Sequence, residues 1–96
     1  MFARPNEIIY KDDFLKDVRA LPKNIQDKLG LLIEILRDDS FDPRLHTKPL
    51  GPPLHGLFSF RIIRGYRVGF DFISPHTIRL IIADRRDKIY KRLQRK

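Results

Sequence analysis

Two arginines in the middle of the chain occupy positions that a strand hairpin would bring together. The stretch SFRIIRGYRVGF, residues 59–70, alternates apolar residues with others around a turn, a pattern typical of a hairpin. A two-residue loop would require positive φ at both Arg64 and Gly65, whereas a three-residue loop of residues 63–65 requires it only at Gly65. We therefore predict the three-residue loop.

The predicted register separates an apolar face from a cationic face. Arg61 lies opposite Arg67 on the cationic face. Because like charges directly across a strand pair repel each other, we expect these side chains either to spread into water or to face an anion. Pairing with Asp71 and Asp84 is the alternative. On the other face Phe60 lies opposite Val68 and Ile62 opposite Tyr66, with Phe70 following.

Further groups that bind anions or transfer protons flank this hairpin. The preceding proline-rich loop carries His46, Lys48 and His55, and the last segment carries Arg85, Arg86 and Tyr90. If the fold brings these elements to one side, they form a phosphate site. Each group also has a structural alternative, since a tyrosine between Ile89 and Leu93 suits a core, a histidine before a glycine suits a turn, and a run of arginines suits a solvated face.

These residue types are sufficient for one enzymatic reaction, the cleavage of RNA without a metal ion. That reaction requires a base for the 2′-hydroxyl proton, cations that stabilise the charge on the phosphorane, and an acid or proton relay for the departing 5′-oxygen. Arg, Lys, His and Tyr can fill these roles. The sequence has no Ser-His-Asp arrangement, no glycine-rich phosphate loop and no paired carboxylates with obvious spacing, so most other enzyme classes have no support.

The distribution of charge favours a polyanionic partner. The formal net charge is +8, but residues 1–42 hold seven Lys/Arg and nine Asp/Glu, whereas residues 43–96 hold thirteen Lys/Arg and three Asp/Glu. Cations concentrated in one half of a chain are typical of nucleic-acid binding, with an acidic protein and anionic lipid as the next partners. Charge that serves only solubility would be scattered.

Length and composition indicate one cytoplasmic domain spanning residues 1–96. A chain of 96 residues can bury a single modest core. It has no apolar run long enough to cross a membrane, and its first residues, MFARPNEI, lack the order of a signal peptide. It has no cysteine, and its three histidines are scattered. We therefore expect no disulfide, no metal and no small-molecule cofactor.

The hydrophobic pattern predicts an α+β fold in the order βααβββ with a basic C-terminal helix or tail. A short strand within residues 7–13 leads to a helix capped by Asp12 or Asp13 and ended by Pro22, and a second helix runs from Lys23 to about Asp38. These helices should form a hairpin against a small, mainly antiparallel sheet. Leu31 and Ile35 widen the apolar face of the second helix, and Gly30 suggests close approach of another backbone.

Residues 39–57 are predicted to form a long loop that is fastened to the body of the protein. Four of the seven prolines lie here, and they exclude a helix or central strand of any length. The loop's apolar residues should attach it to the core; these are Phe41, Leu45, Leu50, Leu54 and Leu57. Residues 77–83, TIRLIIA, form a third strand apolar enough to be buried on both faces.

The chain resembles the RelE/ParE superfamily of type II toxin-antitoxin toxins over nearly its whole length. FLKDVRALPKNIQDKL is similar to the helical hairpin of that family, HTKPLGPPLHGLFSFRI to its loop into the sheet, YRVGFDF to its next strand and RRDKIYKRL to its C-terminal signature. The resemblance implies a small α/β toxin that a cognate antitoxin neutralises. In the RelE-like branch such a toxin enters the ribosome and cleaves mRNA.

The resemblance also implies roles for individual residues. Arg61 and Arg67 match arginines that bind and stabilise the scissile phosphate, and Tyr90 matches a tyrosine that takes part in catalysis or stacks on a base. His46, Lys48 and His55 lie in the loop where relatives place basic or imidazole groups, and of these we expect His55 and Lys48 to be catalytic. Residues implied to bind substrate are His46, Arg64, Arg85 and Arg86. Many relatives have a catalytic histidine where this chain has Arg85, and Arg does not transfer protons near neutral pH. If the chain is a nuclease, a loop histidine or lysine should then supply the base, or the activity should be weak.

Two other functions remain open at this point. The superfamily includes ParE-like toxins that inhibit DNA gyrase without cleaving RNA, and one fold serves both activities. The arginine set, Tyr90 and the basic loop favour the nuclease. The third hypothesis is an inactive relative that binds only its antitoxin or RNA. The absence of a histidine at position 85, where many relatives have a catalytic one, is consistent with this hypothesis.

Overall fold

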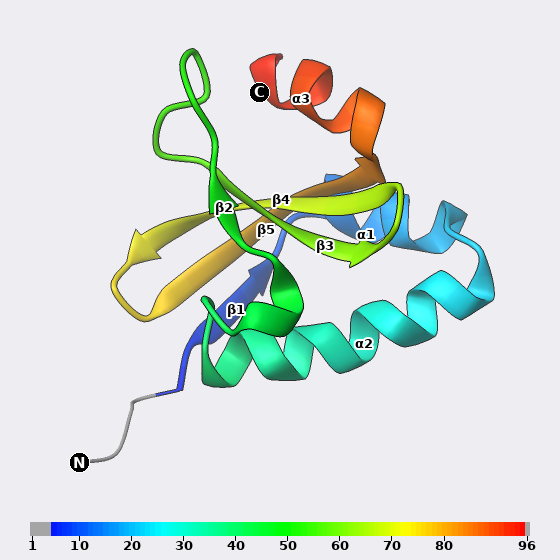
Figure 1. Ribbon diagram of the computed structural model, residues 1–96, viewed down its shortest axis with the longest axis horizontal. Coiled ribbons are helices and arrows are strands. Elements are labelled where there is room, and N and C mark those ends of the chain that lie inside the picture. Colours follow the sequence, from blue (N-terminus) through cyan, green and yellow to red (C-terminus); the bar gives the residue numbers. More distant parts are fainter. Residues whose placement is uncertain (1–4, 96) are drawn as a thin grey trace.

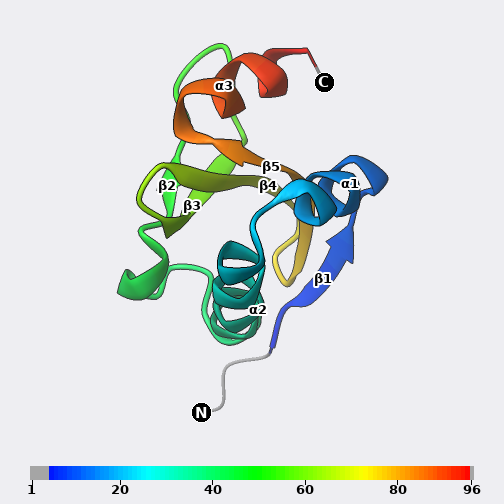
Figure 2. The same ribbon diagram turned by 90° about the vertical axis from the view of Figure 1, so that its right-hand side faces the viewer.

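The structure, a computed structural model, describes residues 5–95 and consists of a five-stranded sheet with helices on both faces (Figures 1 and 2). Residues 1–4 and Lys96, which belong to the N-terminal stretch and the basic tail of the sequence analysis, lie outside the described residues. The elements are β1 (Glu7–Tyr10), α1 (Asp12–Ala20), α2 (Lys23–Asp38), a 3-10 turn η1 (Pro43–Leu45), β2 (Lys48–Pro49), β3 (Phe58–Ile63), β4 (Tyr66–Ser74), β5 (Thr77–Arg85) and α3 (Arg86–Gln94). The predicted α+β class is confirmed, and η1 and β2 are short additions within the proline-rich loop.

The strands lie in the order β1-β5-β4-β3-β2. β1 pairs with β5 in parallel, and every other pair in this sheet is antiparallel. β5 lies between β1 and β4, and its apolar residues are buried on both faces as predicted: Ile78, Leu80 and Ala83 belong to one core cluster, Ile81 and Ile82 to the other. Within residues 5–95, no helix is both long and apolar enough to cross a bilayer.

The two core clusters lie on opposite faces of the sheet. α1 and α2 cover one face, where Phe14 and Leu32 pack with Phe60, Phe70 and other buried residues. α3 covers the other face together with the proline-rich loop, which lies beside it in both views (Figures 1 and 2). This smaller cluster contains Leu50, Leu54, Ile81, Ile82, Ile89 and Leu93. The face covered by α3 is the face that carries the arginines.

The helix boundaries follow the sequence closely, with one correction at the first N-terminus. α2 begins at Lys23 and ends at Asp38 as predicted, and Leu21 before Pro22 is extended, which ends α1. Lys11, not Asp12 or Asp13, is the N-cap of α1, and its side chain makes no capping hydrogen bond. Both aspartates instead lie in the first turn, where a negative charge favours the helix dipole.

The hairpin confirms the predicted arginine pair but not the predicted turn. Arg61 pairs with Arg67, and of the two turn residues only Gly65 has positive φ, at 90°. The predicted pairing of Ile62 with Tyr66 is wrong, because the register shifts between Arg61 and Ile63 and Tyr66 pairs with Ile63. The shift is a bulge on β3, and because of it Ile63, which the prediction placed in the loop, belongs to the strand.

Three apolar or glycine positions also differ from expectation. Leu31 is 67% exposed, so it does not extend the buried face of α2. Phe41 is 56% exposed, although its ring packs against the rings of Phe58 and Phe72. A Cβ at Gly30 would meet nothing within 4 Å, so no backbone approaches there. The glycine that another group approaches closely is Gly69, where the group is the Leu93 side chain of α3.

We expect Gly69→Ala to destabilise the protein and Gly30→Ala to stabilise it. A Cβ at Gly69 would lie 2.9 Å from Leu93 Cδ1 and 3.0 Å from Cδ2. Because Leu93 is buried, the overpacking should lower the free energy of unfolding by about 1 kcal/mol or more. Gly30 is exposed inside α2, so alanine should raise that free energy by up to about 1 kcal/mol. Urea denaturation measures both; shifts of the same sign would contradict this account of α3 packing.

Candidate functional site

Arg67 is a buried cation held by hydrogen bonds from one side. It lies on the sheet face toward α3 and is only 7% exposed. Its Nε donates to Ser59 Oγ at 2.9 Å, and its Nη2 donates to the carbonyl oxygens of His46 at 3.0 Å and Ser59 at 3.3 Å. These bonds use Nε and Nη2, so Nη1 is the nitrogen through which Arg67 would meet an anion. Arg67 has therefore not spread into water.

His46 connects the two arginines. Besides accepting from Arg67 through its carbonyl, it places ring Nε2 2.8 Å from Nη2 of Arg61. A guanidinium has only donors, so Nε2 must be the acceptor and the ring hydrogen of the neutral histidine lies on Nδ1. His46 is also left-handed, at φ 51° and ψ 43°, the one non-glycine residue with positive φ between residues 5 and 95. Strained backbone of this kind is common at functional sites.

Local sequence explains why the chain turns sharply at His46. Pro43 occupies the first turn of η1, where its fixed φ suits a helix. Asp42 caps that turn by accepting from the backbone N–H of Arg44 at 2.9 Å, and Leu45 is fully buried against the core. The hydrogen bonds from the Arg44 side chain and backbone lower the pKa of Asp42 to about 2. This anchored turn projects His46 toward the hairpin.

A cavity of about 610 Å³ opens beside the two arginines. Seven of its ten lining residues are basic: Lys28, Arg44, His46, Arg61, Arg64, Arg67 and Arg86. None of these ten described residues is acidic. Asp71 and Asp84, which were the alternative partners of the arginine pair, are engaged by Arg79 and Arg92 instead. The lining of this cavity thus holds many cationic side chains and, among the ten residues named for it, no carboxylate that could neutralise them.

Electrostatics within the cavity disfavour the charge on Arg67. Burial lowers the pKa of Arg67 below its ordinary value, and the charges of Arg61 and Arg86 lower it further, while Tyr90 opposes the shift. A bound anion would relieve the repulsion among these guanidinium groups. The arrangement therefore favours binding of a phosphate or another compact anion.

A second cavity, of about 550 Å³, continues from the first toward α3. Arg64, Gly65 and Arg86 line both. The backbone N–H of Arg86 donates to the carbonyl of Gly65 at 2.7 Å, which joins the start of α3 to the hairpin turn. Arg85 and Tyr90 line this second cavity, and Arg85 lies 3.8 Å from Asp87. Arg85 therefore has a carboxylate nearby, in a pair that is exposed to solvent, whereas no ion pair of Arg86 is found within residues 5–95.

Tyr90 lies between this second cavity and a third one of about 330 Å³, which the proline-rich loop lines. Lys48 Nζ lies 5.7 Å from the centroid of the Tyr90 ring, a cation-π contact. The Tyr90 hydroxyl is buried and has no hydrogen-bond partner among residues 5–95. A buried hydroxyl without a partner is unfavourable in the free protein, so it is a candidate for bonding to a ligand.

The structure brings together most of the residues singled out from the sequence and separates one of them. Eight lie along the three neighbouring cavities: His46, Lys48, Arg61, Arg64, Arg67, Arg85, Arg86 and Tyr90. His55 is exposed in the turn after Pro53 and lines none of these three cavities. Between residues 5 and 95, no group of three or more His, Cys, Asp or Glu side chains is placed to hold a metal ion.

Sequence reasoning missed Lys28, Arg44 and Ser59. Ser59 lies two residues before Arg61 on the same strand, so strand alternation places it on the cationic face and could have identified it. Lys28 on α2 and Arg44 on η1 reach the first cavity only through the packing of those elements against the sheet. No local pattern marks them.

Comparison with known proteins identifies the fold. No family model matches the chain, and no curated protein sequence matches it. Several solved structures do match the chain. A chain of the RelBE2 toxin-antitoxin complex from Mycobacterium tuberculosis is 25% identical, with a TM-score of 0.72 over 85% of this chain and 99% of that chain. YafQ from Escherichia coli is 17% identical, with a TM-score of 0.73 over 88% and 98%.

A third match is the YoeB/ParE toxin from Agrobacterium tumefaciens, 17% identical, with a TM-score of 0.71 over 82% of this chain and 96% of that chain. In each case the alignment spans nearly all of the other chain. The likeness therefore concerns the whole architecture rather than a single motif. The chain has the RelE-like fold of type II toxin-antitoxin toxins, which confirms the resemblance seen in its sequence.

Proposed function

We propose that this protein is the toxin of a type II toxin-antitoxin pair and cleaves mRNA on the ribosome, in the cytoplasm, without a metal ion. The observation that carries the proposal is the cavity in which Arg61, Arg67 and His46 meet without an acidic residue in the lining. Guanidinium groups that are already in place stabilise charge developing on a phosphorane, and each such group contributes on the order of 10² to 10³ in rate. The toxin fold supports the first part of the proposal, a toxin of a type II pair.

The contact between His46 and Arg61 supports His46 as the general base. Its Nε2 lone pair faces Arg61 across 2.8 Å. A phosphate that binds Arg61 would replace this contact and leave Nε2 beside the substrate, where it can take the 2′-hydroxyl proton. His55 lies away from the arginines, and Lys48 lies over the Tyr90 ring. We therefore assign the base to His46, which the sequence alone placed among the binding residues.

The remaining steps follow from the same positions. As His46 accepts the proton, the 2′-oxygen forms a bond to phosphorus, and the bond from phosphorus to the 5′-oxygen breaks. Arg61 and Arg67 stabilise the added negative charge, and Tyr90, whose hydroxyl has no hydrogen-bond partner within residues 5–95, supplies the proton to the departing 5′-oxygen. The products are a 2′,3′-cyclic phosphate and a 5′-hydroxyl.

A cognate antitoxin is the proposed protein partner. The M. tuberculosis relative is described as a toxin-antitoxin complex. Residues 43–96 of this chain carry thirteen Lys/Arg and three Asp/Glu. This excess of positive charge suits an acidic antitoxin as well as RNA.

A translation extract tests the proposal. Added protein should produce defined cuts in ribosome-bound mRNA, visible by primer extension, and Arg61→Ala should lose them. Arg37→Ala is a matched control, because Arg37 is paired with Glu34 on α2 and lines none of the three cavities; it should cleave normally. Inhibition of supercoiling by purified gyrase with intact mRNA would instead support a ParE-like function. No effect in either assay would support the inactive reading.

A further inference from the structure

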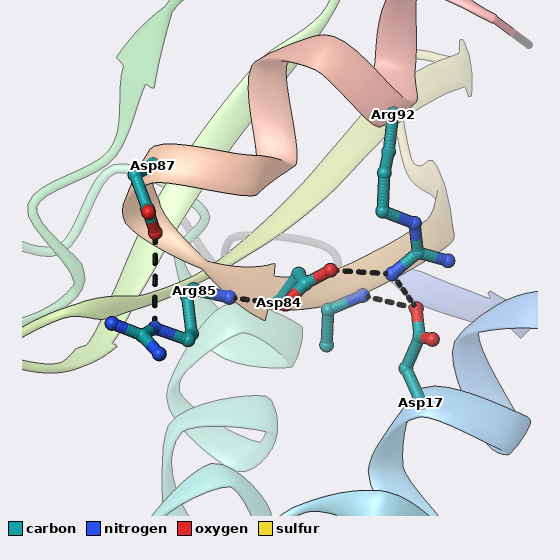
Figure 3. A network of polar contacts seen from close by, with 6 residues as sticks. Asp17, Asp84, Arg85, Asp87 and Arg92 are labelled. Carbon is teal, nitrogen blue, oxygen red and sulfur yellow. Dashed lines mark hydrogen bonds and ion pairs between the residues drawn. The ribbon is translucent and has the colours of Figure 1, made fainter.

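Arg92 connects three elements through one nitrogen. Its Nη1 lies 3.0 Å from Oδ2 of Asp84 on β5 and 3.0 Å from Oδ2 of Asp17 on α1 (Figure 3). The three side chains are largely buried, at 29% exposure for Arg92, 23% for Asp84 and 17% for Asp17. Ion pairs of this kind are screened less by solvent than surface pairs.

The network is fixed to the sheet as well as to α1. The Oδ2 atom of Asp17 also accepts from the backbone N–H of Ala83 at 3.0 Å, beside Asp84. Burial lowers the pKa of Arg92, but hydrogen bonds and charge from Asp17 and Asp84 outweigh that effect and raise it overall. Loss of the guanidinium would leave two carboxylates facing each other at one site, which is unfavourable.

Arg92 lies on a different side of α3 from the residues that line the cavities. Arg86 and Tyr90 are four residues apart, so they lie on one side of the helix. Arg92 follows Tyr90 by two residues, a spacing that points to a different side. Other anchors of α3 are Ile89 and Leu93, which pack in the smaller core cluster, and the bond from the Arg86 N–H to Gly65 at its first turn. The contact at Arg92 holds a further side of the helix, near its C-terminal end, and so restricts how far α3 can rotate about its axis.

We propose that Arg92, held by Asp17 and Asp84, is a positioning residue that sets the rotation of α3 and thereby keeps Tyr90 and Arg86 at the cationic cavities. Arg92 does not line any of the three cavities and has no direct role in the chemistry. The effect on cleavage rests on the proposed function. The effect on the position of α3 does not.

Amide hydrogen exchange tests the structural part. In Arg92→Ala, amides of α3 should exchange at least about tenfold faster than the loss of global stability accounts for, and Arg92→Lys, which keeps the charge, should restore part of the protection. Arg79→Ala is the matched control. Arg79 also forms a partly buried pair, at 2.6 Å from Asp71, but it joins β5 to β4. In this control, exchange in α3 should follow global stability alone.

Cleavage of ribosome-bound mRNA tests the functional part. Arg92→Ala should lower the maximal rate by about tenfold to 10²-fold, since misplaced catalytic groups lose rate steeply, while the half-saturating concentration changes much less. If α3 exchange in Arg92→Ala follows global stability as in Arg79→Ala, the proposal is overturned. It is also overturned if α3 loosens and the rate is unchanged. If the wild-type protein does not cleave mRNA at all, the proposed function fails and the exchange result alone decides the positioning role.

Discussion

Arg67→Met should lower the rate of mRNA cleavage by about 10² to 10³ while the protein remains folded. In the proposed mechanism this loss of rate follows from removing a cation that is held in place to stabilise the scissile phosphate. Two effects on stability oppose each other. Methionine removes a guanidinium whose pKa is lowered by burial, so the variant no longer has to bury this charge and its folded state gains stability. It also removes the hydrogen bonds to Ser59 and His46, which costs about 1–3 kcal/mol for the groups left unpaired.

Single-turnover cleavage and urea denaturation measure the two effects separately. Arg64→Met is the matched control, because Arg64 lines the same cavity but is exposed in the hairpin turn. It should weaken cleavage less than Arg67→Met does. A folded Arg67→Met protein that cleaves at the wild-type rate would remove Arg67 from the mechanism.

His46→Gly should lower the cleavage rate by about 10² to 10⁴, the contribution of a general base. Glycine tolerates the left-handed backbone at this position, so the free energy of unfolding should not fall on account of backbone strain. Because the variant removes the ring, imidazole added to the solution should restore part of the rate. If the rate fell only because the contact with Arg61 was lost, added imidazole would not restore it.

His55→Gly separates the two loop histidines. His55 is exposed and lines none of the three cavities, so the variant should cleave at nearly the wild-type rate. The opposite ranking, with a strong effect at His55 and none at His46, would contradict the assignment of the base. Rate constants at saturating ribosome-bound mRNA provide the comparison.

The sequence predicted the features that depend on local pattern. The period of apolar residues placed α2 at residues 23–38, and the conformational freedom of Gly65 placed the hairpin so that Arg61 lies opposite Arg67. The bulge on β3 was not predictable in this way, since it depends on how Ile63 and Tyr66 pack at the end of the sheet.

Most of the site depends on contacts between distant residues. Arg67 is buried because Ser59 and the carbonyl of His46 meet it from β3 and the end of η1. The same loop contains His46 and His55, and only the capped turn at Asp42 directs one of them toward the arginines. Pairing of Asp84 with Arg92, rather than with a cavity arginine, follows from the docking of α3. Apart from the place of Ser59 on the cationic face, which strand alternation indicates, none of these contacts has a signature in sequence spacing.

The most direct measurement of the central claim is an NMR titration of the arginine side chains with a short RNA that carries 2′-deoxyribose at the reacting position. The Nε–H signals of Arg61 and Arg67 should shift together as the RNA saturates the protein. The signals of Arg79 and Arg92, which are paired with aspartates away from the cavity, should not shift. Saturable binding that shifts Arg79 or Arg92 and leaves Arg61 and Arg67 unchanged would contradict the claim that this cavity binds the RNA backbone.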